Sequence, residues 1–161
     1  MPIPELLHTI RESEGKLLEC RISSMGPSSA AFLFVEGDWH KIAKLENILE
    51  NFASRHHLAL HFKRDKSVAH ELNQLPYTVD VISADRMGLA DELAKFFTER
   101  DMTILDLTAN RYTAARTGLP IVSIRLTIGI PLSHRIISLR DEFLDYCDEF
   151  NLDAVMEPVK Q

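Results

Sequence analysis

The sequence predicts an α+β fold that contains two copies of one structural plan. Alternating apolar segments, typical of strands, and segments with apolar residues every three or four positions, typical of helices, follow one another in the same order in both halves. The chain also matches itself at two offsets. At an offset of 87, Leu18-Glu19 falls on Leu105-Asp106, and at an offset of 94, His40-Lys41-Ile42 falls on His134-Arg135-Ile136. The larger second offset corresponds to extra residues in the second half, which a surface loop accommodates at small cost.

The first half is expected to contain a helix, two strands, a second helix and a third strand. Leu6, Leu7 and Ile10 share one face of the first helix. Asp38 is positioned to cap the N-terminus of the second helix. The predicted segments are helices over residues 4–14 and 39–56, and strands over residues 17–23, 31–35 and 58–63.

The second half is expected to open with a strand that the first half lacks. Asp85 follows this strand and is positioned to cap the next helix. A later strand carries Val122, Ile124, Leu126 and Ile128 on one face, which is expected to pack against the helices. The predicted segments are strands over residues 77–83, 103–109, 121–128 and 152–156, a helix from residue 89, a helix capped by Ser133 that runs to Phe150, and a loop over 110–120.

This order of elements predicts two domains and a linker. Residues 76–161 form a complete βαββαβ module, which is the ferredoxin-like plan of a four-stranded antiparallel sheet with two helices on one face. Residues 1–66 form the same module without its opening strand, and the polar residues 67–75 form the linker.

The missing strand is costly in this plan, because the first strand is central and lies between the third and the fourth. Its absence leaves backbone groups unpaired on two strands. Three explanations remain open: the start of the chain is assigned too late, residues 67–72 fill the gap, or a partner chain supplies a strand.

Composition and charge exclude several classes of function. Lys and Arg total 18 against 24 Asp and Glu, and the net charge of −6 argues against direct binding to nucleic acid. The two cysteines, Cys20 and Cys147, lie in different halves, form no disulfide framework, and are both expected to be buried thiols. No apolar run approaches the length of about 18 residues that spans a bilayer. We therefore expect a cytoplasmic protein without a membrane segment.

No constellation in the sequence indicates catalysis or metal binding. His56, His57 and His61 are close in sequence, but no cysteine or paired carboxylate joins them at the spacing of metal ligands. The chain has no nucleophile elbow and no glycine-rich phosphate loop. We therefore expect no enzyme, no metal site and no cofactor.

The order of elements, the repeat and one short motif resemble tandem ACT-domain proteins. The motif is Ala-Asp-Arg-Met-Gly-Leu at residues 84–89, directly after a strand. Among ACT-domain proteins, the chain is most similar to the glycine cleavage system transcriptional repressor family, in which the turn reads Asp-Arg-Pro-Gly and Met87 here replaces the proline. In the first copy, Gly37-Asp38-Trp39 followed by Ile42 and Leu45-Glu46 is similar to the helix start of that family.

The resemblance implies a small-ligand site, often for an amino acid, near the turn after the first strand. The physics agrees, because a helix N-terminus attracts carboxylates and Gly88 lets a ligand approach the backbone. Plainer roles remain open: Asp85 as a helix cap, Gly88 as a turn residue, and Arg86 as a solvated charge. Residues 1–4 stand where the first copy would need its glycine turn, so no site is carried over there. The candidate ligand-binding residues are Asp85, Arg86, Met87, Gly88, Leu89, Asp106 and Asn110, with Thr108 as a further strand position.

The function implied by the resemblance is amino-acid sensing, of the glycine type, that controls transcription through a protein partner. Self-association through sheet or helix pairing is also expected. Two alternatives remain: a detached regulatory subunit of an amino-acid or one-carbon enzyme, as in the N-terminal ACT part of formyltetrahydrofolate deformylase, and a dimerisation scaffold whose ligand site has decayed.

Overall fold

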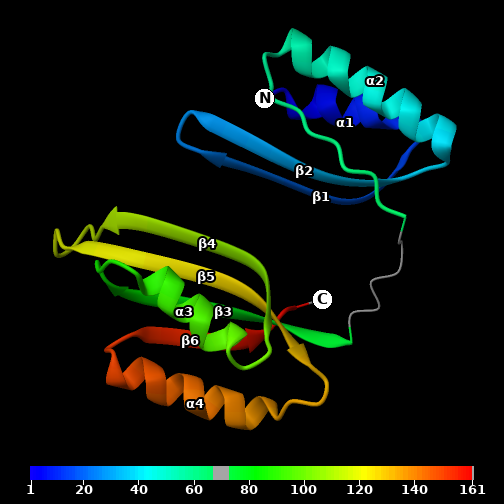
Figure 1. Cartoon of the computed structure of the whole chain (residues 1–161). Coiled ribbons are helices and arrows are strands. Elements are labelled where there is room, and N and C mark those ends of the chain that lie inside the picture. The colour runs from blue at the N-terminus through cyan, green and yellow to red at the C-terminus, as the bar shows by residue number, and fades with distance from the viewer. Residues whose placement is uncertain (67–72, 161) are drawn as a thin grey trace. The chain divides into compact units, whose positions relative to one another are not determined.

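The computed structural model describes residues 1–66 and 73–160. The chain divides into two compact units, Met1–Val68 and Ala69–Gln161, and each is described by itself (Figure 1). Most of the predicted linker, residues 67–72, lies outside the described residues, as does the proposal that these residues fill the gap in the first module. The two predicted linker residues Gln74 and Leu75 already belong to the first strand of the second unit.

The second unit has the complete plan that the sequence predicts. Its four strands form one antiparallel sheet in the order β4-β5-β3-β6, so the first strand of the unit is central and is paired on both sides. The elements are β3 (Gln74–Ala84), α3 (Leu89–Thr98), β4 (Thr103–Thr113), β5 (Pro120–Pro131), α4 (Ile136–Glu149) and β6 (Asp153–Pro158).

One face of this sheet is covered by both helices. Val79 and Val81 of β3 are completely buried, together with the alternate residues of β5 that the sequence assigned to the inner face. They pack against Leu93 and Phe97 of α3 and against Phe143 of α4. Seventeen buried hydrophobic residues in the described part of the unit form a single core, which fixes the start of α3 over the sheet.

In its described residues, the first unit has two helices over a two-stranded sheet. Leu6 and Ile10 of α1 pack against Leu45, Leu49 and Phe52 of α2, and these five buried residues are its whole core cluster among the described residues. The elements are α1 (Ile3–Glu12), β1 (Lys16–Met25), β2 (Ser28–Glu36) and α2 (Trp39–Arg55).

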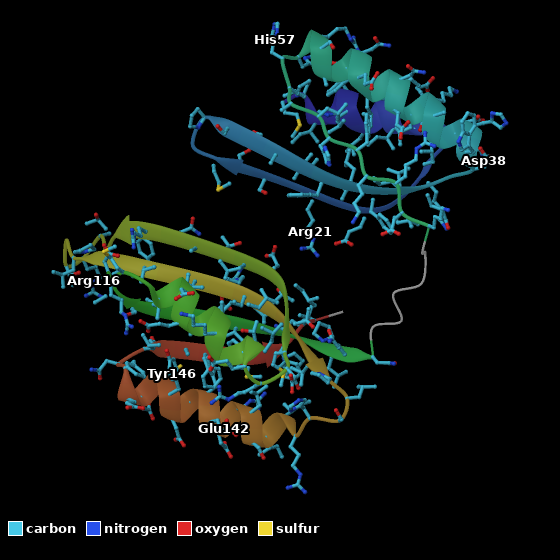
Figure 2. All side chains as sticks on the ribbon, in the orientation of Figure 1. Arg21, Asp38, His57, Arg116, Glu142 and Tyr146 are labelled. Atoms are coloured by element: carbon cyan, nitrogen blue, oxygen red, sulfur yellow. The ribbon has the colours of Figure 1, made fainter. Side chains whose placement is uncertain are left out.

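The predicted cap of the second helix is confirmed. The Asp38 carboxylate lies at the start of α2 (Figure 2) and accepts a hydrogen bond of 2.9 Å from the backbone N–H of Lys41. This bond holds the pKa of Asp38 below its usual value, because it favours the charged form.

The strand predicted over residues 58–63 is wrong. The alternation was real, since Leu58 and Phe62 do pack against the core of the first unit, but these residues form no strand. A strand needs a neighbour to bond with. In the second unit the corresponding β6 is paired with β3 alone. The first unit has no strand in the place of β3 among its described residues, so the segment after α2 has no ladder to join.

Two further expectations need correction. The predicted loop over residues 110–120 is shorter, because β4 continues to Thr113 and β5 begins at Pro120.

Cys147 is buried as expected, and burial raises the pKa of its thiol to about 11. Cys20, however, is exposed, because β1 lies at the edge of a two-stranded sheet that covers little of its own side chains.

Across residues 1–66 and 73–160, no helix combines the length and the apolar character needed to cross a membrane. Within the same ranges, no three side chains of His, Cys, Asp or Glu gather closely enough to hold a metal ion.

Candidate ligand site at the start of α3

The turn over residues 85–88 joins β3 to α3 and ends in a backbone conformation suited to glycine. Gly88 is the N-cap residue, with a φ of +80°, which residues with a Cβ adopt only under strain. The prediction that Asp85 caps this helix is therefore wrong. Because Gly88 has no side chain, no side-chain hydrogen bond caps the first turn of α3, and its N–H groups remain available to a ligand.

Asp85 instead ties the turn to the neighbouring strands. Its carboxylate lies 2.9 Å from Nε of Arg111 on β4, and its backbone N–H donates a hydrogen bond of 3.1 Å to the carbonyl of Pro120 on β5. The sequence reasoning missed Arg111, because it ended this strand at Ala109. The strand-forming residues Tyr112 and Thr113, which follow directly, were the available signal.

A cavity of about 450 Å³ lies between the start of α3 and the strands β4 and β5. Its volume falls within the range of small-molecule sites. Arg86 and Arg111 are the two basic residues of its lining, and Val122 and Ile124, which are almost completely buried themselves, form part of its apolar wall. The lining residues are Arg86, Gly88, Leu89, Ala90, Asp91, Ala109, Asn110, Arg111, Val122 and Ile124.

The structure brings four of the seven predicted site residues to this cavity. Arg86, Gly88, Leu89 and Asn110 line it, although the Leu89 side chain is itself buried in the core.

The other three predicted residues lie outside the cavity lining. Asp85 adjoins the cavity through its ion pair with Arg111. Met87 is 88% exposed. Asp106 lies on β4 four residues before Asn110, which corresponds to about 13 Å along a strand.

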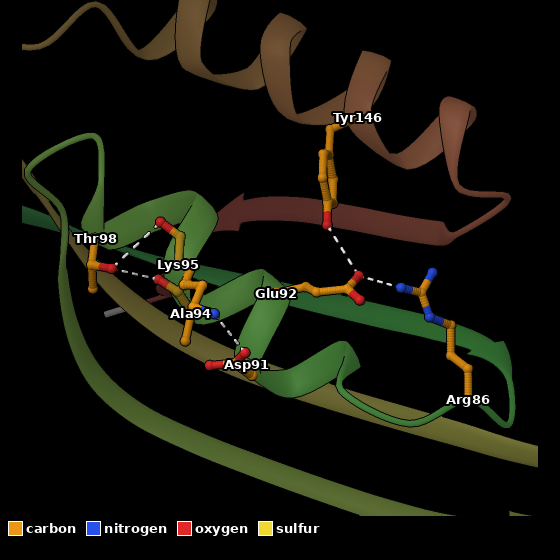
Figure 3. Close-up of polar contacts among 7 residues, drawn as sticks. All are labelled: Arg86, Asp91, Glu92, Ala94, Lys95, Thr98 and Tyr146. Atoms are coloured by element: carbon orange, nitrogen blue, oxygen red, sulfur yellow. Dashed lines mark hydrogen bonds and ion pairs between the residues drawn. The ribbon is translucent and has the colours of Figure 1, made fainter.

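Arg86 is held by a network that connects the turn to both helices of the unit (Figure 3). Its guanidinium forms an ion pair with Glu92 on α3 and lies 5.8 Å from the ring centre of Phe150, just beyond the end of α4. The hydroxyl of Tyr146 on α4 donates to the same Glu92 carboxylate at 3.5 Å. Burial, and then the nearby Glu92 carboxylate, raise the pKa of Tyr146, so this hydroxyl stays protonated and remains a donor.

The charges around the cavity are balanced. Arg86 is paired with Glu92, and Arg111 with Asp85. Asp91, a third carboxylate in the lining, is paired with Lys95 at 2.9 Å. A ligand therefore meets groups of both signs rather than a purely positive pocket.

Comparison with known proteins gives structural matches only. No family model matches the chain, and no curated protein matches it. A crystal structure described as a "putative glycine cleavage system transcriptional repressor" is similar with a TM-score of 0.75 and 19% sequence identity, over 99% of this chain and 90% of the other. An unknown protein from Galdieria sulphuraria is similar with a TM-score of 0.72 and 15% identity, over 98% of this chain and 90% of the other. At these identities the likeness establishes the fold, and the chain has the fold of a tandem ACT-domain protein.

Proposed function

We propose that this chain is a non-catalytic regulatory protein whose second unit binds a small amino acid in the cavity at the start of α3. The observation that carries the proposal is the meeting of uncapped N–H groups of α3, charged groups of both signs and an apolar surface around about 450 Å³.

Each part of a small amino acid finds a matching group. The α-carboxylate is attracted by the N-terminus of α3 and by Arg86. The ammonium group is attracted by the carboxylate of Asp91. A small side chain, or the hydrogen of glycine, faces the apolar part of the lining at Ala90 and Ala109.

The output of this site is proposed to be the control of transcription through a protein partner in the cytoplasm. The fold shared with the protein described as a glycine cleavage repressor supports a regulatory role. The net charge of −6 favours contact with a protein over direct contact with DNA. The chain is also proposed to associate with itself, since Ile137 and Leu144, seven residues apart on α4, are exposed apolar residues suited to helix pairing.

Thermal unfolding of the full chain with single amino acids, glycine and serine included, at millimolar concentration tests the ligand site. A ligand at 100 times its Kd stabilises the folded state by about 2.7 kcal/mol. For a unit of this size we expect a rise in Tm of about 14 °C. No shift with any amino acid would contradict the sensor and leave a scaffold.

The variant Gly88→Val locates the site, and Gly118→Val is its matched control. Both glycines have positive φ, at +80° and +67°, so both valines impose similar backbone strain. Gly118 lies in the β4–β5 hairpin, outside the cavity lining. We expect Gly88→Val to abolish the ligand-induced shift and Gly118→Val to retain it. A shift retained in Gly88→Val would place the ligand elsewhere.

A further inference from the structure

The two units differ at one position of the sheet. In the second unit, β3 lies between β5 and β6 and is paired with both. In the first unit, β2 corresponds to β5, and residues 58–63 correspond to β6. Among the described residues, β2 is paired only with β1, so its other edge faces the position that β3 occupies in the second unit.

Both borders of this position carry unpaired backbone. Along its outer edge, β2 pairs with no other strand in the described part of the chain. After the bond of 2.9 Å from the Leu58 N–H to the Ala53 carbonyl, residues 59–64 make no backbone–backbone hydrogen bond to any described residue. Leu58 and Phe62 nevertheless pack against the core of the first unit, which holds this segment beside it. Such rows of unpaired N–H and C=O groups are a template for a further strand.

The composition of β2 is not that of a protected edge. Residues 28–35 contain no charged residue and no proline, and Phe32 and Phe34 are 75% and 44% exposed. The true edge strands of the second unit carry charges: Arg111 on β4 and Glu157 on β6. Charged residues at edges discourage pairing with other chains, and β2 has none between Ser28 and Val35.

We propose that the first unit binds one extended strand of another protein along the open edge of β2, antiparallel to it. The internal repeat defines the chemistry of this strand. β3 fills the corresponding position of the second unit with buried Val79 and Val81 on one face, and with Thr78 and Asp80 alternating on the other. The occupant is therefore an uninterrupted strand with apolar side chains at every second position, bound mainly through backbone hydrogen bonds.

A single strand explains the site better than pairing of β2 with β2 of a second copy. Self-pairing would satisfy the edge of β2 but leave the backbone N–H and C=O groups of residues 59–64 without hydrogen-bond partners among the described residues. One inserted strand bonds to β2 on one side and to residues 59–64 on the other, as β3 does with β5 and β6.

The test uses hydrogen exchange of the full chain with a synthetic peptide of residues 74–84 as the probe. We expect the peptide to slow exchange at least tenfold in Ser28–Glu36 and in residues 59–64, and to leave β5 unchanged. The control peptide carries Val79→Asp and Val81→Asp, which removes the apolar face, and it should give no protection. If the amides along the outer edge of β2 in the free chain exchange as slowly as those of β5, the edge is already occupied and the proposal is wrong.

A fused variant tests whether the site accepts a strand, independently of whether that strand comes from another protein. A copy of residues 74–88 joined directly to Ile3 places a strand and its glycine turn ahead of α1. Protection of β2 and residues 59–64 in this variant supports the site, and unchanged exchange overturns it. If the fused strand protects these residues but the peptide at 1 mM does not, the proposal that the strand comes from another protein is wrong. Two other results would also overturn it. One is a dimer, detected by sedimentation, in which β2 is protected from exchange. The other is an intact mass that shows further residues before Met1, if those residues protect β2.

Discussion

Gly88 and Arg111 mark the two limits of reasoning about single residues in this chain. The role of Gly88 as a turn residue could be predicted from the sequence, because it stands between a strand and a helix and glycine readily adopts the positive φ that such turns use. The proximity of Arg111 to Asp85 did not follow, because it depends on the register of two ladders. Val122 on β5 faces both Arg111 on β4 and Ser83 on β3, which brings Arg111 to the end of β3 where Asp85 begins the turn.

The two cysteines should differ sharply in reactivity. Cys147 is buried and its thiol has a pKa of about 11, so at pH 8 only about one molecule in a thousand carries the reactive thiolate. Cys20 is exposed on β1. We expect iodoacetamide at pH 8 to add one label to the native chain, at Cys20, and two labels in urea, as counted by mass spectrometry. Equal labelling of both thiols in the native chain would contradict the burial of Cys147.

Glu92→Gln should increase the affinity for an amino acid at the proposed site. Glu92 neutralises Arg86, and an amide in its place leaves the guanidinium free to bind the ligand carboxylate. Since partly exposed ion pairs contribute up to about 1 kcal/mol, we expect a decrease in Kd of about twofold to threefold, measured by calorimetry. Asp80→Asn is the control, because it removes the same charge from another ion pair, with Arg125, away from the cavity. An unchanged or weaker affinity in Glu92→Gln would show that Glu92 does not compete with the ligand.

At the scale of elements, the sequence predicted where side chains pack more reliably than where strands pair. The inward face of β5 was predicted from alternation alone, since each inward residue is buried by its own position. Residues 58–63 show the same alternation and the same inward packing of Leu58 and Phe62, yet form no strand. Alternation reports burial on one face, whereas a strand also needs a paired neighbour, and that neighbour is absent among the described residues of the first unit.

The cavity could not be predicted for a related reason. The motif at residues 85–88 indicated the start of a helix and a ligand, but the opposite wall comes from β4 and β5, more than twenty residues further along the chain. Its shape depends on how closely Gly88 and Ala90 approach Ala109, which is a property of packing and not of any local pattern.

At the scale of the whole molecule, the two units should unfold separately. Among the described residues, the second unit has seventeen buried hydrophobic residues in its core, and the first has five. Trp39, the single tryptophan, lies in the first unit, and all three tyrosines lie in the second. We expect tryptophan fluorescence to change at a lower urea concentration than the near-ultraviolet signal of the tyrosines. Coincident transitions would show that the chain unfolds as one cooperative body.

Because the edge of β2 is open, the stability of the first unit depends on the concentration of the strand that binds there. The second unit contains its own β3 and has no such dependence. A strand that binds only the folded first unit stabilises it by mass action, and above its Kd each tenfold rise in free strand adds about 1.4 kcal/mol. When the strand is scarce, the small core stands alone and the unit opens more often, and proteases cleave in proportion to that open population. The lifetime of the protein in the cell would then follow the abundance of its partner, with no change in its own synthesis.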